Sequence, residues 1–230
     1  MIRTAMHCAL LAIALVGGLA HAQSYPNRQI RLIVTGTPGQ GTDVVSRAIA
    51  LRLADRLKQQ VVVENRAGAG GNIAAESVAK AAPDGYTLLM ATNATHAANP
   101  AMYAKMPYDP IADFAPIALV GMLPMMMSAS PAFPAGSVRA VIDAAVANPG
   151  TINVAIPSSS ARVSLELFKQ LSHSELFPVN YKGSGPAFVD LFSGRIQLTI
   201  DTVSATLPHI AAGKLKPLAV TTGQRFEAVR

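Results

Sequence analysis

The chain has 230 residues, a formal net charge of +6 and only 14% charged residues. Its basic residues are scattered rather than clustered and aromatic residues make up 5%, so the basic, aromatic surface typical of nucleic-acid binding is missing. One cysteine, Cys8, excludes a disulfide framework within the chain. We therefore expect a protein that binds no nucleic acid and folds by burying apolar surface, in one large or two small domains.

Residues 1–22 have the pattern of a secretory signal peptide. Arg3 gives a positive start, residues 8–19 form a short apolar run, and AHA at residues 20–22 matches an A-x-A cleavage site. The run is too short for a membrane span. Cys8 lies at its start, whereas a lipoprotein would carry its cysteine at the end. We predict cleavage after residue 22 and export to the periplasm.

Residues 23–124 are expected to form a first α/β lobe. Three short apolar runs predict strands, over residues 30–34, 61–63 and 86–90, and the first of them is expected to be buried. Two helices are expected between them, over residues 45–57, where apolar residues recur every four positions, and over residues 72–81. The order β-α-β-α-β favours a parallel sheet with helices on its faces.

The middle of the chain has a different pattern. Residues 99–116 are rich in proline and predict an irregular connection with one short helix. Residues 117–129 are apolar and are expected to cross to a second lobe. Three consecutive methionines, residues 125–127, are interpreted as packed core rather than as a metal site.

A second α/β lobe is expected over residues 125–217. Its predicted strands cover residues 152–156, 177–181 and 196–200. Its predicted helices cover residues 138–147 (capped by Ser137), 163–171, 185–192 and 203–212. A further strand is expected to start at residue 218, and residues 218–230 are interpreted as the start of a return to the first lobe. The links between the lobes would form a hinge.

Three loops that follow predicted strands carry small polar residues: residues 35–43, 91–96 and 158–160. In a parallel sheet, ligands bind outside the carboxyl ends of the strands. Because these loops come from both lobes, we expect a binding cleft between the lobes.

The first of these loops reads TGTPGQGTD. Gly39 and Gly41 would let the backbone approach a ligand closely, and Thr42 is expected to cap the helix that follows. Free N–H groups at that helix start favour an anion such as a carboxylate. A purely structural turn is the alternative for this loop. Asp43 either binds a ligand group or water, or stabilises the start of the helix.

No recognised catalytic, nucleotide or metal motif is present. The chain lacks G-x-x-x-x-G-K-[ST] and G-x-S-x-G, and Ile73 stands where a dinucleotide fingerprint needs its third glycine. We therefore interpret residues 68–71 as a tight turn. His96, His173 and His209 show no metal-ligand spacing. We expect a protein that is not an enzyme and has no cofactor or metal. Two alternatives stay open, a secreted hydrolase that uses a serine of residues 158–160 with His96, and a sensory ligand-binding module.

Several motifs occur together and in order: PGQGTD (38–43), VVENR (62–66), GAGGN (68–72), APDGY (82–86), PYD (107–109), DFAP (113–116), YKG (181–183) and LPHI (207–210). With these motifs, residues 25–226 resemble the Bug-type periplasmic solute-binding receptors of tripartite tricarboxylate transporters. The resemblance implies a type II periplasmic binding protein fold, two α/β lobes with a hinge, which captures a small carboxylate or related solute as a monomer. Membrane permease subunits of the transporter would then receive the solute.

The resemblance also implies ligand-binding residues in the loops of both lobes. Carried over by position, these are Pro38, Gly39, Gln40, Gly41, Thr42, Asp43, Thr92, Asn93, Thr95, His96, Ser158, Ser159, Ser160 and Asp201. The family usually has a glycine at position 40, where this chain has glutamine. Family members also continue beyond the position of Arg230 with a segment that returns to the first lobe, so we expect a chain that is truncated at its C-terminus.

Overall fold

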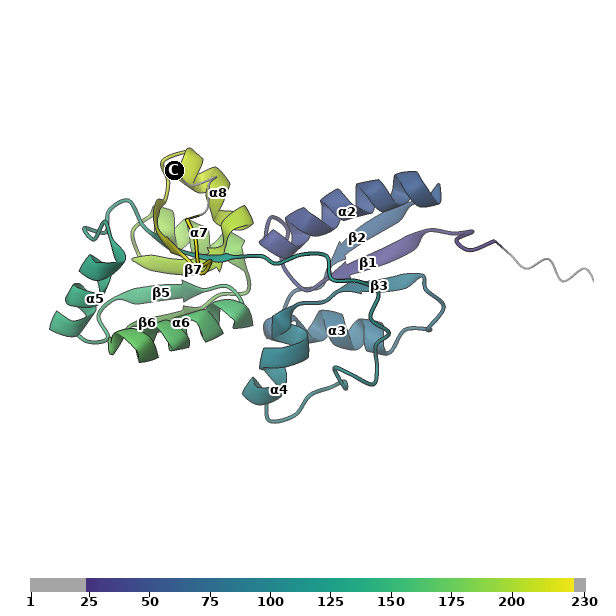
Figure 1. Cartoon of the computed structure of the whole chain (residues 1–230), viewed down its shortest axis with the longest axis horizontal. Helices are drawn as coiled ribbons and strands as arrows, with labels where there is room; N and C mark the ends of the chain where they lie inside the picture. The colour runs from purple at the N-terminus through teal and green to yellow at the C-terminus, as the bar shows by residue number, and fades with distance from the viewer. Residues whose placement is uncertain (1–23, 226–230) are drawn as a thin grey trace, which may run out of the picture.

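The computed structural model describes residues 24–225, so the predicted signal peptide lies outside the described residues. Two lobes lie side by side, and the chain crosses from the first to the second in an extended segment at residues 115–124 (Figure 1). This segment carries exposed apolar side chains, among them Ile117, Leu119 and Met122. Among the described residues, no helix is both long and apolar enough to cross a membrane.

The first lobe contains a parallel three-stranded sheet in the order β2-β1-β3. Its strands are β1 (Ile30–Val34), β2 (Val61–Asn65) and β3 (Thr87–Met90). Helices α2 (Gly41–Leu57) and α3 (Asn72–Ala79) lie on opposite sides of this sheet (Figure 1). The crossover from β1 to β2 and the crossover from β2 to β3 run in opposite directions across the sheet, so right-handed connections place their helices on opposite faces. The parallel β-α-β-α-β order predicted from the sequence is confirmed.

The second lobe contains a mixed five-stranded sheet in the order β6-β5-β7-β4-β8. The strands are β4 (Met125–Ala129), β5 (Asn153–Ile156), β6 (Phe177–Asn180), β7 (Leu198–Thr202) and β8 (Lys216–Val220). The helices are α5 (Val138–Ala147), α6 (Ser159–Ser172), α7 (Ser184–Phe192) and α8 (Val203–Ala211). Strand β4 runs antiparallel to both of its neighbours, β7 and β8, while β5, β6 and β7 are parallel.

Apolar side chains are buried on both faces of this second sheet. Val154 and Ile156 pack with Val141 of α5 and Leu165 of α6 in one cluster. Ala155, between them in the sequence, faces a second cluster that includes residues of α7 and α8. This alternation follows from the two-residue period of a strand.

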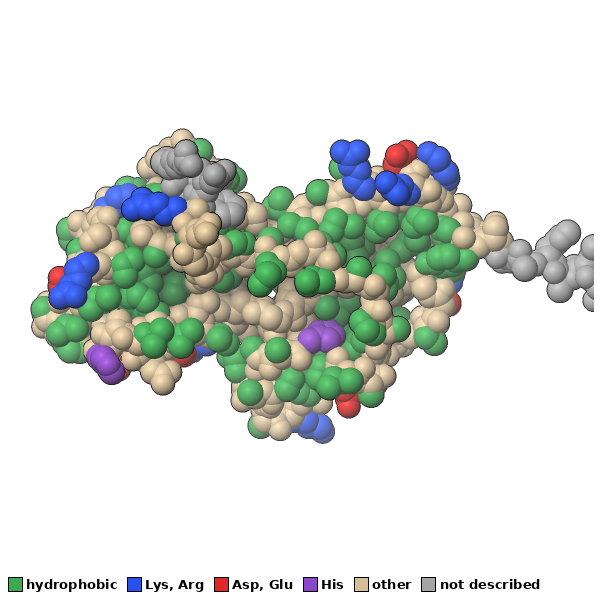
Figure 2. Space-filling model, in the orientation of Figure 1, with side chains coloured by type: hydrophobic (Ala, Val, Ile, Leu, Met, Phe, Trp, Pro, Cys, Tyr) green, Lys and Arg blue, Asp and Glu red, His purple; other side chains and the backbone are tan. Residues whose placement is uncertain are grey.

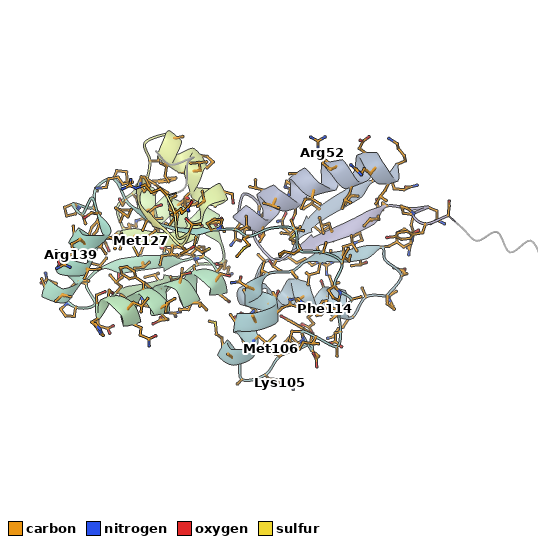
Figure 3. The ribbon with its side chains drawn as sticks, in the orientation of Figure 1. Arg52, Lys105, Met106, Phe114, Met127 and Arg139 are labelled. Atoms are coloured by element: carbon orange, nitrogen blue, oxygen red, sulfur yellow. The ribbon has the colours of Figure 1, made fainter. Side chains whose placement is uncertain are left out.

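The methionines of β4 belong to this core, as expected. Met126 is fully buried and Met127 is only 6% exposed. Figure 3 shows Met127 inside the second lobe, whereas Arg52 projects outward from α2. Long cationic side chains of this kind remain in solvent because burying an unpaired charge is costly.

Several predicted boundaries were wrong. Helix α2 begins at Gly41 rather than at residue 45, and α6 begins at Ser159 rather than at residue 163. Strand β7 covers Leu198–Thr202 rather than residues 196–200. Strand β8 pairs with β4, so residues 218–220 belong to the second sheet. From the sequence, these residues were predicted to start the return to the first lobe.

Short helical turns complete the interface between the lobes. They are the 3₁₀ turn η1 (Ala69–Gly71), the π-helical turn η2 (Ala94–Ala98) and α4 (Asn99–Met102). The lobes meet where α2 packs against α8 and where η2 packs against α6. The carboxyl ends of β1 and β3 thus face the second lobe.

Candidate functional site

A cavity of about 570 Å³ lies between the two lobes. The first lobe contributes to its wall Thr35, Gly36, Gln40, Thr42, Gly68, Ala69, Gly70, Gly71, Thr92, Asn93, Ala94, Met102 and Tyr103. The crossing segment and the second lobe contribute Leu123, Met125, Ile156, Pro157, Ser158, Ser159, Ser160, Arg162, Asn180, Tyr181, Lys182 and Thr202. Most of these residues follow strands at their carboxyl ends, where a parallel sheet places a ligand site.

The start of α2 forms one wall of the cavity. Gln40 precedes the helix in an extended conformation, and its carbonyl accepts the Val44 N–H at 3.0 Å. The first N–H groups of a helix have no partner within it and carry partial positive charge. Thr42 was expected to cap this helix, but it lies inside the first turn and its hydroxyl bonds to no residue of the described chain.

Asp43 stabilises the loop rather than facing the cavity. Its carboxylate is 3% exposed and accepts bonds from the Gly39 N–H at 2.9 Å and from Asn65 Nδ2 at 2.9 Å. Arg47, one turn along α2, adds an ion pair at 2.9 Å. Burial alone would raise the pKa of Asp43, but the bonds from Arg47, Gly39 and Asn65 outweigh it and lower the pKa.

We predict that Asp43→Ala lowers the free energy of unfolding by about 2 kcal/mol at pH 7, because it leaves two donors and the Arg47 guanidinium without their acceptor. Urea denaturation measures this loss. Asp55→Ala is the control, because the Asp55–Lys58 pair is about four-fifths exposed and such pairs contribute roughly 0–1 kcal/mol. Equal losses in both variants would contradict the role assigned to Asp43.

The start of α6 faces α2 from the second lobe. Ser158 caps this helix by accepting the Ala161 N–H at 3.2 Å, and Ser160 donates to Asn93 Oδ1 of the first lobe at 2.7 Å. Ser159 is 7% exposed and lies against Gly70, where a Cβ atom would come within 2.4 Å of the serine oxygen. Residues 158–160 are therefore a helix start and an inter-lobe contact, and the expectation of a loop was wrong.

The segment after β3 divides between the cavity and the core. Thr92 and Asn93 line the cavity. Thr95 is fully buried, with its hydroxyl donated to the Thr92 carbonyl at 3.1 Å. The His96 ring packs edge-on against Phe114, with 4.8 Å between ring centroids, and its Nδ1 lies 2.9 Å from the Thr95 hydroxyl. Burial lowers the pKa of His96 and favours its neutral form.

The arrangement of His96 offers no support for hydrolysis. Its Nδ1 is paired with the adjacent threonine, and no hydrogen bond within residues 24–225 joins it to Ser158, Ser159 or Ser160. A serine nucleophile needs a base within hydrogen-bond reach. Within the same residues, no group of three or more histidine, cysteine, aspartate or glutamate side chains is placed to hold a metal ion.

Asp201 lies behind the cavity wall rather than in it. It is 1% exposed within β7, and its Oδ1 accepts the Thr202 N–H at 2.7 Å. Burial raises the pKa of Asp201 to about 6, and the nearby Ser184 and Thr202 offset this only in part. Thr202, the next residue, lines the cavity in its place.

Seven of the fourteen residues expected at the ligand line the cavity: Gln40, Thr42, Thr92, Asn93, Ser158, Ser159 and Ser160. Pro38 and Gly39 lie in the exposed outer part of the loop, and Gly41 packs against Thr202 and Ser204 of the second lobe. Residues 180–182 line the cavity but were not predicted to do so. They lie at the carboxyl end of strand β6 and just after it, so the rule that located the other loops also applies to them.

The charged side chains on the cavity wall are both cationic, Arg162 and Lys182. Arg162 forms an ion pair with Glu166 at 3.1 Å, and none of the residues that line the cavity has a carboxylate side chain. On the face shown in Figure 2, acidic side chains are few and scattered over both lobes. The cavity therefore combines helix starts, hydroxyl groups and positive charge, a combination that favours an anionic ligand.

Comparison with known proteins agrees with this geometry. Residues 45–229 match the family model described as the tripartite tricarboxylate transporter family receptor. Protein BugT of Bordetella pertussis is 38% identical over 218 residues, which cover 94% of this chain and 67% of BugT. A UPF0065 protein of Bordetella bronchiseptica is 34% identical, and the match covers 93% of this chain and 64% of that protein.

Two solved structures that are similar to this chain have a carboxylate in their names. R. palustris Rpa4515 with adipate has a TM-score of 0.85 and 41% identity, covering 87% of this chain and 68% of that one. MatC from Rhodopseudomonas palustris with bound malate has a TM-score of 0.81 and 32% identity, covering 87% and 69%. This chain spans about two thirds of the length of these relatives. It belongs to the tripartite tricarboxylate transporter receptor family.

Proposed function

We propose that this protein is a periplasmic solute-binding receptor that holds a small carboxylate between its lobes and delivers it to the membrane subunits of a tripartite transporter. One observation carries the proposal. The inter-lobe cavity is lined by residues at the starts of α2 and α6, one helix from each lobe, and its charged residues are both cationic. The adipate and malate in the names of two related structures support the same ligand class.

The ligand would be held by donors rather than by reacting groups. Free N–H groups at the starts of α2 and α6 would donate to carboxylate oxygens, with hydroxyl groups and water bridges completing the contacts. Because the cavity wall comes from both lobes, a bound anion would favour the closed arrangement over an open one. The Ser160–Asn93 bond already links the lobes in the arrangement seen here.

The proposal includes where the protein works and in what state. Export would follow cleavage of the signal peptide after Ala22, and the mature receptor would act as a monomer that meets the permease after binding its solute. A monomer suits this role because both walls of the cavity come from one chain. Size-exclusion chromatography with light scattering, together with N-terminal sequencing of exported protein, measures both points.

We predict that adipate, malate or citrate raises the melting temperature and gives a saturable heat in isothermal titration, since a ligand that binds only the folded state stabilises it by mass action. Arginine and nicotinamide, which lack a net negative charge, serve as negative controls. Tight binding of a cation with no binding of any carboxylate would contradict the proposed ligand class. A folded protein that binds none of the compounds would count against the receptor function itself.

A further inference from the structure

The side chain of Gln40 folds back over its own loop. Its Oε1 accepts the Thr37 N–H at 3.1 Å, and it forms no side-chain cap on α2. The residue is only 8% exposed, yet it belongs to the cavity wall. Gly36 makes this position possible, because a Cβ atom there would lie 2.3 Å from Gln40 Oε1.

The bond to Thr37 fixes which end of the carboxamide faces the ligand. Only the oxygen of the amide can accept the Thr37 N–H, so Nε2 must point away from it. Within residues 24–225, Nε2 has no hydrogen-bond partner. The buried side-chain atoms that lack a partner within these residues include Thr42 Oγ1 but not Gln40 Nε2, so Nε2 is an end of this amide that water or a ligand in the cavity can reach.

Gln40 is not the only side-chain donor at this end of the cavity. The Thr42 hydroxyl is buried without a partner, and it converges with Gln40 on the space above Gly36, 2.8 Å from a Cβ atom placed there. The first N–H groups of the 17-residue helix α2 lie at the same wall. The nearest carboxylate of the loop, Asp43, is occupied by Gly39, Asn65 and Arg47. This end of the cavity therefore offers donors and no charged acceptor.

We propose that Gln40 determines specificity at this end of the cavity, where its Nε2 donates to one carboxylate oxygen of the ligand beside the start of α2 and the Thr42 hydroxyl. This inference rests on the proposed function and extends it to one residue and one ligand group. An acceptor-only oxyanion satisfies all of these donors together. An ammonium group finds no carboxylate there, and an uncharged amide or alcohol satisfies fewer donors.

The test is isothermal titration of the whole chain with adipate, malate and citrate. Gln40→Glu keeps an oxygen for the Thr37 N–H but places a negative charge where the donor was, so we expect affinity to fall by about 100-fold. Gln40→Met keeps the length and removes both the donor and the oxygen that accepts the Thr37 N–H, and we expect a loss of about 10-fold. Gln60→Glu makes the same chemical change at an exposed position of the first lobe, and we expect a change of less than about 2-fold.

The possible results distinguish the role of Gln40 from the receptor function. If the wild-type chain binds a carboxylate and both Gln40 variants bind it equally well, the role of Gln40 is overturned and the receptor function stands. If only Gln40→Glu loses affinity, repulsion rather than a lost donor explains the result, and the donor role is overturned. If the wild-type chain binds none of the three anions, the proposed function fails and this inference fails with it. Urea denaturation of each variant shows that a loss of affinity is not a loss of folding.

Discussion

Replacing Gly183 by alanine is expected to weaken carboxylate binding by about 10- to 100-fold while leaving each lobe folded. Gly183 precedes α7 in an extended conformation, φ 160° and ψ −178°, that any residue can adopt. A Cβ atom there would lie 2.2 Å from Thr37 Oγ1 and 2.6 Å from Thr37 Cγ2, in the opposite lobe. The added methyl group would hold the lobes apart, and overpacking of this kind costs about 1–3 kcal/mol.

Two further variants separate this steric effect from other causes. Gly185→Ala adds the same methyl group two residues later, where nothing lies within 4 Å, and we expect wild-type affinity. Thr37→Ala combined with Gly183→Ala removes both clashing atoms and leaves only the Thr37 Cβ at 3.0 Å, so affinity should recover. Wild-type affinity in Gly183→Ala alone would show that close approach of the lobes is not needed for binding.

The order of strands and helices could be predicted from the sequence because burial leaves a local pattern. The apolar run of β1 reflects a strand that is buried on both faces, and the four-residue spacing in α2 reflects a half-buried face of that helix. The residues at which helices begin were harder to predict. Gly41 and Ser159 are typical of loops, but Gln40 and Ser158 lie just before them in the extended conformation of a helix cap, so both residues belong to the first turn.

The apolar run of residues 117–129 shows where local patterns are insufficient. Its last five residues form β4 and the earlier ones remain an extended crossing, although both parts are similarly apolar. The difference comes from pairing with β7 and β8, which lie about 70 to 95 residues further along the chain. Neither the pairing nor its antiparallel direction is encoded in the run itself.

For the site, the sequence predicted the loops better than the orientation of their side chains. Asp43 is turned from the cavity by Asn65, which lies 22 residues away at the end of β2. His96 is turned by Phe114, whose ring packs against it from the far side of the irregular connection. Contacts between distant segments decide which residues of a polar loop line the cavity, and these contacts cannot be read from the spacing within the loop.

Asp201→Asn is expected to raise the free energy of unfolding on the order of 3 kcal/mol at pH 7 and to change it little below pH 4. The pKa of Asp201 is raised from an ordinary value of 3.8 to about 6 in the folded protein. Between these two pH values, the folded protein keeps a proton on Asp201 that the unfolded chain has released. Stability from this group is therefore greatest below pH 4 and decreases as the pH rises toward 6. A shift of about two pH units corresponds to about 3 kcal/mol.

Asparagine reproduces the neutral form of this side chain at every pH. Its oxygen can accept the Thr202 N–H as Oδ1 does now. Its Nδ2 can donate to the buried Ser184 hydroxyl, which lies close enough to Asp201 to lower the pKa of its carboxyl, although no hydrogen bond of ordinary geometry joins them. Urea denaturation from pH 4 to pH 8 measures the difference between variant and wild type, and the other titrating groups contribute equally to both. A constant difference across that range would show that Asp201 does not titrate as assigned.

The same variant separates stability from binding. Asp201 lies behind Thr202 and does not line the cavity, so a gain in stability without a change in carboxylate affinity is the expected pair of results. In that case the ionised Asp201 only lowers the stability of the folded protein, because β7 buries its carboxylate, and it has no role in binding. If Asp201→Asn is more stable but binds carboxylates more weakly, the ionised aspartate contributes to ligand capture through the wall, and its retention at that cost has a functional reason.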